Sequence, residues 1–515
     1  MPKQVHRQKK TLLIWGIILV LGTSMACQLT SPRPASWSGT PTAAARNTEI
    51  ALTQAAIAGA GNFVFTPTLP TRTPEITPTL ISPTPQTDTP GPWLIFINPQ
   101  GQGLRAYDLS AQKTIEIDLP EPIIDTDLTR GVAPDGSKLI LRAGSALNTD
   151  ELALYQIDLP SFGVNKLSPL LSIPVQRKIV NNDSALALET LAIVTHSDGL
   201  AWSPNSRYLA FTAALDGETS DLYFVDIQKN RIDRLNGLLS QNTSPTWSPD
   251  GNWLISQELE FVHQLEEWHS MLVSGIRIPS FDSQNTIYNP HFNSLEEVIV
   301  GWLNPSTFIS YSNTDAGPWR LRQVNMEGLQ VYIIIEDFFQ EVGFDPASGV
   351  IAFTINYSTA AAQGLAGGIY RRTLDSPVNK LQATGNWSYL TWDSGGMFVA
   401  SGAQGVLLFT PQGESMLLPG EGHARLSPNG SWFITWGDGI NTTAGARLFQ
   451  SHNSSPLQTL INEPVEVLFW QPDSKGFFIL SEGSLYRYIF PGLKPDEVIT
   501  GLPEGAQFIW VEQPQ

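Results

Sequence analysis

The clearest structural signal in the sequence is Thr246-Trp-Ser-Pro-Asp-Gly-Asn-Trp-Leu-Ile255. Its proline presets φ for the first central position of a tight turn, and the Asp-Gly pair tolerates the strained second half of that turn. The tryptophan before the turn suits a contact between neighbouring sheets, and the apolar residues after it suit a strand that buries alternate side chains. These ten residues therefore predict a turn that leads into a buried strand.

The same pattern recurs along the chain after residue 93. A second apolar strand usually follows each copy, as Asp221-Leu-Tyr-Phe-Val-Asp226 does. Turn, strand, turn, strand with a period of roughly 35–55 residues is typical of one four-stranded propeller blade. The other copies are 132–141 (VAPDGSKLIL), 201–211 (AWSPNSRYLAF), 302–309 (WLNPSTFI), 344–353 (FDPASGVIAF), 392–399 (WDSGGMFV), 426–434 (LSPNGSWFI) and 470–479 (WQPDSKGFFI).

The two ends of the repeat region complete one blade together. Three strands are predicted at 93–97, 104–108 and 114–118, and the strand they lack is predicted at 507–511. Pairing the two ends removes an open sheet edge. Eight repeat turns plus this composite blade count to nine, but rings of seven or eight blades are more usual. We therefore expect an all-β fold, a single β-propeller over residues 93–515 with about eight four-stranded blades, within a range of seven to nine.

Two stretches fit the repeat poorly. The gap between Ser161 and Gly199 is too long for a connection between blades, so we expect an insertion there. Residues 256–300 are predicted to hold a second insertion, because Gln257 to Val273 has little strand character.

The repeats resemble those of the TolB-type β-propeller family, which are WD-like and carry W-S-P-D-G before an apolar strand. The copies at 201–226 and 246–255 are close to this pattern, and those at 302, 344 and 392 depart from it. The resemblance implies the propeller fold for nearly all of 93–515. It also makes a role in envelope protein complexes an expectation, because members of that family act there.

The N-terminus has the features of an export signal, predicted at residues 1–26. A basic segment precedes an apolar run from Leu12 to Leu21, and small residues follow. The run is shorter than the ~20 apolar residues that span a bilayer. The basic residues are Lys3, Arg7, Lys9 and Lys10.

The only cysteine of the chain, Cys27, follows this signal directly. The segment resembles a bacterial lipoprotein signal, which implies cleavage between Ala26 and Cys27 and lipidation of Cys27. Ser24-x-Ala26 also fits the small-x-small rule of an ordinary signal peptidase, which would release the protein. A third alternative is an uncleaved anchor. We expect the lipid anchor, and with it an extracytoplasmic protein held at the membrane of a bacterial cell.

Residues 27–92 are predicted to form a disordered, lipid-anchored stalk. Thr66 to Pro92 contains eight prolines and nine threonines in 27 residues. Proline at this density removes amide donors and fixes φ, so neither helix nor sheet can propagate. The expected state is an extended spacer, partly polyproline II.

Composition narrows the function. The 515 residues contain 30 Lys+Arg and 48 Asp+Glu, for a net charge of −18. This acidic balance argues against nucleic-acid binding, and a single cysteine rules out a disulfide framework. The sequence has neither a G-x-S-x-G elbow nor an H-E-x-x-H zinc motif. The densest histidine cluster is His263 and His269 with Glu266 and Glu267 between them, which we interpret as a solvated loop. No catalytic residue, metal or cofactor is predicted.

Fifteen tryptophans invite a binding role, but those within the repeats are predicted to be core residues. The remaining candidates for an exposed binding surface are Trp268, Trp319, Trp387 and Trp436. We expect a non-enzymatic, monomeric binding or scaffolding protein of the cell envelope, with a protein partner or a glycan. The alternative is an envelope hydrolase or lyase that acts on glycans through carboxylates in the propeller funnel.

Overall fold

The computed structural model describes most of the repeat region and one short strand before it. The described ranges are 79–80, 91–99, 103–148, 152–159, 161–195, 198–235, 241–262, 267–277, 288–289, 297–312, 320–328, 330–336, 339–355, 366–373, 379–437 and 442–512. The predicted signal, Cys27 and nearly all of the predicted stalk lie outside them.

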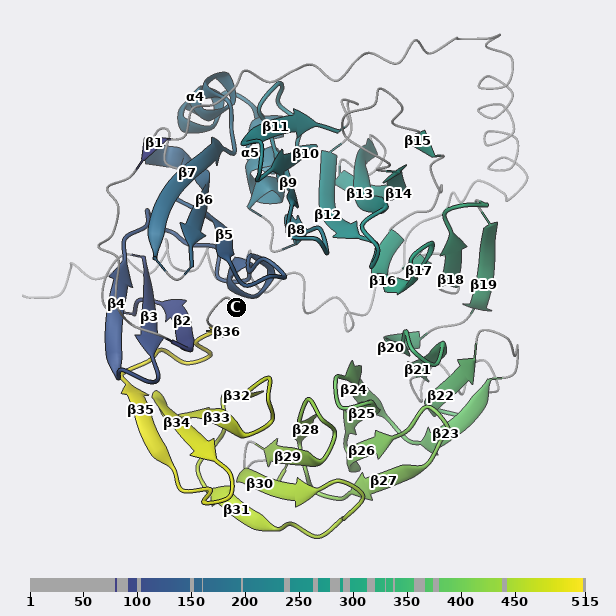
Figure 1. Ribbon diagram of the computed structural model, residues 1–515. Helices are drawn as coiled ribbons and strands as arrows, with labels where there is room; N and C mark the ends of the chain where they lie inside the picture. Colours follow the sequence, from purple (N-terminus) through teal and green to yellow (C-terminus); the bar gives the residue numbers. More distant parts are fainter. Residues whose placement is uncertain are drawn as a thin grey trace, which may run out of the picture. The chain divides into compact units, whose positions relative to one another are not determined.

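The described residues form nine four-stranded sheets arranged as the blades of a ring (Figure 1). In seven of them, blades 3 to 9, four successive strands run from the centre of the ring to its rim. Blade 3 comprises β8 (Leu200–Trp202), β9 (Tyr208–Ala213), β10 (Asp221–Asp226) and β11 (Arg231–Arg234); blade 4 comprises β12 (Gln241–Trp247), β13 (Trp253–Val262), β14 (Glu267–Arg277) and β15 (Tyr288–Asn289); blade 5 comprises β16 (Glu297–Asn304), β17 (Thr307–Ser312), β18 (Arg320–Asn325) and β19 (Gln330–Glu336); blade 6 comprises β20 (Phe339–Asp345), β21 (Val350–Ile355), β22 (Gly368–Thr373) and β23 (Lys380–Thr384); blade 7 comprises β24 (Trp387–Asp393), β25 (Met397–Gly402), β26 (Gly405–Phe409) and β27 (Ser415–Leu418); blade 8 comprises β28 (His423–Leu426), β29 (Trp432–Gly437), β30 (Gly445–Gln450) and β31 (Gln458–Ile461); blade 9 comprises β32 (Val467–Trp470), β33 (Gly476–Ser481), β34 (Ser484–Ile489) and β35 (Asp496–Thr500).

Blade 1 is built from both ends of the repeat region, as predicted. Its strands are β36 (Phe508–Val511), β2 (Trp93–Ile97), β3 (Leu104–Asp108) and β4 (Lys113–Ile117), in that order. β36 pairs antiparallel with β2, from Trp93 opposite Val511 to Phe96 opposite Phe508. The propeller prediction is confirmed. The number of blades in the described residues is the upper end of the predicted range, and it equals the eight repeat turns plus the composite blade.

Blade 2 departs from the pattern on both sides. Its regular strands are β5 (Lys138–Ala143), β6 (Ala153–Asp158) and β7 (Gly163–Pro169). Helix α3 (Asp127–Arg130) lies where the inner strand would run, flanked by single bridges from Ile123 to Ala143 and from Val132 to Leu139. On the rim, β1 (Thr79–Leu80) pairs antiparallel with β7. β1 falls within the predicted stalk, for which we expected no strand.

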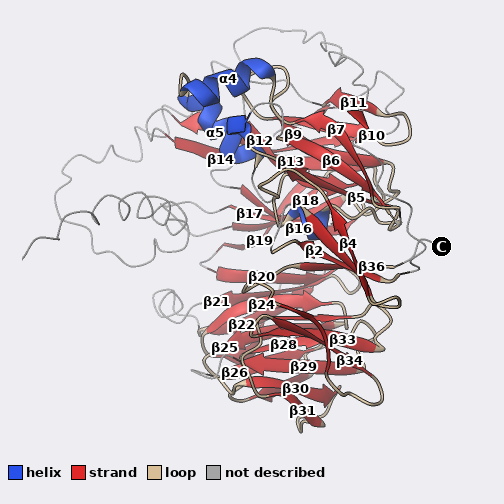
Figure 2. Ribbon diagram, turned by 90° about the vertical axis from the view of Figure 1, so that its left-hand side faces the viewer, coloured by secondary structure: helices blue, strands red, loops and turns tan. Residues whose placement is uncertain are grey.

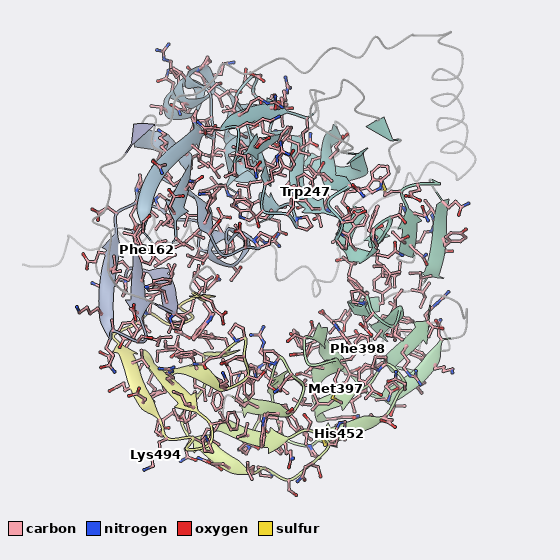
Figure 3. All side chains as sticks on the ribbon, in the orientation of Figure 1. Phe162, Trp247, Met397, Phe398, His452 and Lys494 are labelled. Atoms are coloured by element: carbon pink, nitrogen blue, oxygen red, sulfur yellow. The ribbon has the colours of Figure 1, made fainter. Side chains whose placement is uncertain are left out.

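Buried apolar clusters lie between neighbouring blades and close the ring. Each of the nine clusters of described residues joins one pair of adjacent blades, and one of them joins blade 9 to blade 1. Between blades 1 and 2, Trp93 packs edge-on against Phe162 with ring centroids 5.5 Å apart. Figure 3 labels Phe162 at this side of the ring. Stability is therefore distributed over equivalent interfaces rather than held in one central core.

The repeat tryptophans of blades 3 and 4 bond each blade to the one before it. Trp202 Nε1 donates to the carbonyl oxygen of Gly131 at 2.7 Å, and Trp247 Nε1 donates to that of Ala201 at 3.0 Å. Within the turn, Ser248 Oγ donates to Asp250 Oδ1 at 2.6 Å and accepts from the Trp253 amide at 2.9 Å. The last turn position has positive φ, 72° at Gly251, which glycine tolerates. The repeat tryptophans thus have the structural role that the sequence predicts.

The first predicted insertion exists and is helical. After β7 come α4 (Ile173–Asn181), at the outer side of blades 2 and 3, and α5 (Ala185–Val194), which contacts β9 and the innermost strand of blade 4, β12 (Figures 1 and 2). A short 3₁₀ helix, η1 (Ala146–Asn148), contacts α4. The helices were not predicted, because nine or ten residues give only a short periodic signal. In the described part of the chain, no helix combines the length and the apolar character needed to span a membrane.

The prediction that Gln257 to Val273 has little strand character is wrong; most of 278–296 lies outside the described residues, so an insertion there stays a prediction. Most of Gln257 to Val273 lies in β13 and β14, which pair from Trp253 opposite Arg277 to Val262 opposite Glu267. The polar residues that suggested a loop belong to two long strands of blade 4.

Candidate binding surface

The outermost strand of blade 5 exposes apolar side chains in an unusual way. β19 reads Gln330-Val-Tyr-Ile-Ile-Ile-Glu336, an apolar run of five residues with polar ends. Val331, Tyr332 and Ile333 are 41%, 54% and 51% exposed. Consecutive side chains of a strand point to opposite faces, so β19 is open to solvent on both faces over these three residues. We call β19, residues 330–336, the blade 5 rim strand.

A bulge at Ile334 turns this one side chain inward. The pairing with β18 places Ile335 opposite Leu321 and Ile333 opposite Arg322, so Ile334 is the extra residue. Its side chain is buried in the cluster between blades 5 and 6. Bulges commonly re-aim side chains near sheet edges. Here the bulge buries Ile334, whereas Ile335 is half-buried and Glu336 is exposed again.

The outer edge of the blade 5 rim strand has no strand partner among the described residues. An edge strand presents backbone N–H and C=O groups to an incoming chain, and proteins usually protect such edges with charges. The outermost strands of some other blades follow that rule, since β4 carries Lys113 and Glu116 and β35 carries Asp496 and Glu497, whereas β27 and β31 carry no charge. In blade 2, β1 covers the rim edge of β7, which shows that this ring accommodates an added antiparallel strand.

Polar groups define the two ends of the surface. Arg320 Nε donates to Glu336 Oε1 at 3.1 Å, and both side chains are about half exposed. At the other end, the Tyr332 hydroxyl donates to Gln330 Oε1 at 2.8 Å. The exposed apolar centre is therefore bordered by a charge-balanced pair and a neutral amide.

The four predicted tryptophans do not form a common surface in the described residues. Trp387 is only 2% exposed and packs in the cluster between blades 6 and 7, so its assignment as a binding residue is wrong. Trp436 is half-buried on blade 8 and stacks on His423 with centroids 5.4 Å apart. Trp319 and the side chain of Trp268 lie outside the described part of the structure.

Sequence reasoning missed the blade 5 rim strand. The signal was present as the run Val331-Tyr-Ile-Ile-Ile335, but such a run also fits a buried strand. Only the strand order shows that it lies at the rim of the ring, where a neighbouring strand covers one side alone.

Two cavities lie elsewhere on the ring. One, of about 310 Å³, is lined by the repeat turns of blades 3 and 4, including Trp202, Trp247 and Arg130. The other, of about 280 Å³, borders β27 and contains Glu421. Arg447 binds that carboxylate through two hydrogen bonds of 2.9 and 2.7 Å. Neither lining contains the pair of carboxylates that glycoside chemistry commonly uses.

A buried acid on blade 3 has a strongly shifted pKa. Burial raises the pKa of Asp221 to about 7, against the opposing attraction of Arg234, whose Nη2 lies 2.7 Å from Asp221 Oδ2. The Asp221 side chain is fully buried, and the Tyr223 hydroxyl nearby donates to Asp216 Oδ2 at 3.2 Å. The network connects β10, β11 and the loop before β10, which is a structural role.

Metal ligation has little support in the described residues, where His, Cys, Asp and Glu form no group of three that could hold an ion. The predicted cluster around His263 cannot be placed, because His263 and Glu266 lie outside the described ranges.

Comparison with known proteins supports the fold. No protein-family model matches the sequence, and no curated protein matches it. Among solved structures, the crystal structure of the eukaryotic initiation factor is similar at 11% identity, over 82% of this chain and 99% of that one, with a TM-score of 0.51. The likeness is one of fold alone.

Two further structures are more distant. TolB from Acinetobacter baumannii is 13% identical over 56% of this chain and 62% of its own, with a TM-score of 0.28. Oligogalacturonate lyase in complex with manganese is 12% identical over 82% of this chain and 99% of its own, with a TM-score of 0.36. Beyond the fold itself, the relationship to the TolB-type family that the repeat motifs indicate stays a prediction.

Proposed function

We propose that the protein is a non-enzymatic binding or scaffolding protein of the bacterial cell envelope. Residues 1–26 export it and a lipid on Cys27 holds it at the membrane. Its ring then presents the blade 5 rim strand to a protein partner. The observation that carries the proposal is the run of three exposed apolar residues, Val331 to Ile333, on an edge without a described strand partner.

The partner expected at this edge is an extended segment that adds a strand to blade 5. In such complexes the main-chain hydrogen bonds supply affinity and alternate side chains supply specificity. Val331, Tyr332 and Ile333 are each about half exposed, so covering them contributes roughly 2–4 kcal/mol. That is less than the cost of immobilising a partner. The segment must therefore bring β-branched or aromatic residues of its own and further contacts to the ring.

The experiment is capture from solubilised envelope with residues 69–515 as bait. This range is one compact unit and contains all nine blades, so it retains the closed ring. The test variant is Val331→Lys with Ile333→Lys, because lysine is a common protector of edge strands. The matched control is Leu381→Lys, since Leu381 is 45% exposed on β23, the outermost strand of blade 6.

We expect mass spectrometry to find a near-stoichiometric protein that resists salt, that the double variant loses and that the control retains. A partner that both variants retain contradicts the assignment of the site. An empty bait in several detergents contradicts the scaffold function. The glycan hydrolase or lyase would then come first, tested with sugars and cell-wall fragments.

A further inference from the structure

A second exposed apolar surface lies on the helical insertion. Leu147 of η1 is 66% exposed, Ile173 and Val180 of α4 are 55% and 47% exposed, and Leu188 of α5 is 40% exposed. We call these four residues the helical patch. Ile173 and Val180 are seven positions apart and therefore lie on one face of α4, two turns from each other.

The helical patch has a rigid support. The opposite sides of the same elements are buried between blades 2 and 3, through Ala146, Val175, Ile179 and Val194. Arg142 Nη1 donates to the carbonyl oxygen of Val194 at 2.7 Å, at the end of α5. Glu218, in the loop before β10, binds Lys178 of α4 and accepts from Ser184 Oγ at 2.7 Å. Because both helices are held at several points, the exposed side chains keep fixed positions.

The described chain enters the ring beside this patch. β1 pairs with β7, and β7 leads within a few residues to α4 (Figure 1). About 50 residues separate Cys27 from β1, and a chain of that length spans at most about 180 Å. A head anchored through Cys27 therefore stays within that distance of the bilayer, and the tether meets it at β1, next to the helical patch. At the effective concentration that a tether creates, even weak insertion suffices.

Charge around the patch favours apolar insertion over electrostatic attraction. Arg177 and Asp183 are both exposed on or next to α4, so neither sign dominates. The whole chain carries a net charge of −18, which disfavours general attraction to anionic lipid. Helices that lie on membranes bury an apolar face at the boundary between headgroups and acyl chains.

We infer that the helical patch is a membrane-contact surface, whose four apolar side chains insert into the outer part of a lipid bilayer and orient the propeller on it. The inference rests on the proposed membrane location, but it concerns a surface distinct from the blade 5 rim strand. It identifies the lipid bilayer itself as the ligand of α4, α5 and η1.

Vesicle flotation tests the inference with residues 28–515, which lack both signal and lipid. The probes are vesicles of phosphatidylcholine alone and of phosphatidylcholine with about one third phosphatidylglycerol. The test variant is Ile173→Glu with Val180→Glu, and the matched control is Leu457→Glu, because Leu457 is 61% exposed in the loop before β31, across the ring (Figure 1). We expect binding to both vesicles that high salt does not weaken, a loss of about a hundredfold in the double variant, and no change in the control.

Three results would overturn the inference: no binding to either vesicle, equal binding by the double variant, or binding that needs anionic lipid and disappears in salt. Loss of the captured envelope protein in the double variant, without vesicle binding by the wild type, would make the patch a protein surface instead. The variant Val331→Lys with Ile333→Lys should float like the wild type, so failure of this inference and failure of the proposed function give different results.

Discussion

The ion pair between Asp127 and Arg142 makes a quantitative prediction. Both side chains are fully buried, and Arg142 binds the carboxylate through Nε at 2.8 Å and Nη2 at 2.6 Å. A third bond runs from the Arg142 amide to Asp127 Oδ2 at 2.9 Å, and Arg142 Nη1 reaches Val194 at the end of α5. This one residue therefore connects α3, β5 and the helical insertion.

Arg142→Met keeps much of the buried volume but leaves the carboxylate without its cation. Breaking a buried pair by removing one partner costs about 3–5 kcal/mol, whereas replacing both partners is much cheaper. We expect Arg142→Met to lower the free energy of unfolding by about that amount. The double variant Arg142→Met with Asp127→Asn should regain at least half of the loss, since no buried charge remains.

Urea unfolding followed by tryptophan fluorescence measures these differences, and hydrogen exchange locates them. Residues 185–195 should lose protection in Arg142→Met, while blades 6 to 8 keep theirs. A cost below about 1 kcal/mol in Arg142→Met, or costs of Arg142→Met and of the single variant Asp127→Asn that simply add in the double variant, would contradict this prediction.

Three further predictions concern the turns, a buried acid and the anchor. Trp247→Phe removes the hydrogen bond to the Ala201 carbonyl and should lower the free energy of unfolding by about 1 kcal/mol more than Trp302→Phe. The reason is that the buried Trp302 Nε1 has no hydrogen-bond partner among the described residues. Equal costs in the two variants would contradict the role of the bond. The folded-state pKa of Asp221 is raised from 3.8 to about 7, so its contribution to stability is complete below pH 3.8 and is lost as the pH rises through 7. Between pH 4 and 8, the free energy of unfolding of the wild type should fall by up to about 4 kcal/mol relative to that of Asp221→Asn, as urea denaturation measures it. A difference between the two proteins that does not change with pH would rule out the raised pKa. Cys27→Ser should prevent lipidation and leave the protein out of the detergent phase in a detergent partition assay; unchanged partition would favour an uncleaved anchor.

The fold was largely predictable because the repeat is local. Each turn motif, such as 246–255 or 426–434, lies at the hairpin between the first two strands of one blade, so counting turns counted blades. The terminal strands showed the ring closure in the same way. Ring sizes seen elsewhere suggested fewer blades than the motif count, and the motif count was the better guide.

The surfaces were not predictable, because they depend on strand order and on tertiary contacts. Val331 to Ile333 is as apolar as a core strand, and only its place at the rim of blade 5 exposes it. Trp387 had no turn motif around it, yet neighbouring blades bury it. The helices α4 and α5 gain stability from packing on blades 2 and 3, a contribution that short sequence windows do not contain.

Hydrogen exchange of the complex between residues 69–515 and the captured envelope protein shows whether the partner adds a strand to blade 5. A strand added to blade 5 must bond to the outer edge of β19, so amides within 330–336 should exchange at least about tenfold more slowly in the complex. Amides of β23, at 380–384, should exchange at an unchanged rate and serve as the internal control. Unchanged exchange in β19, with protection confined to another part of the ring, would contradict the account.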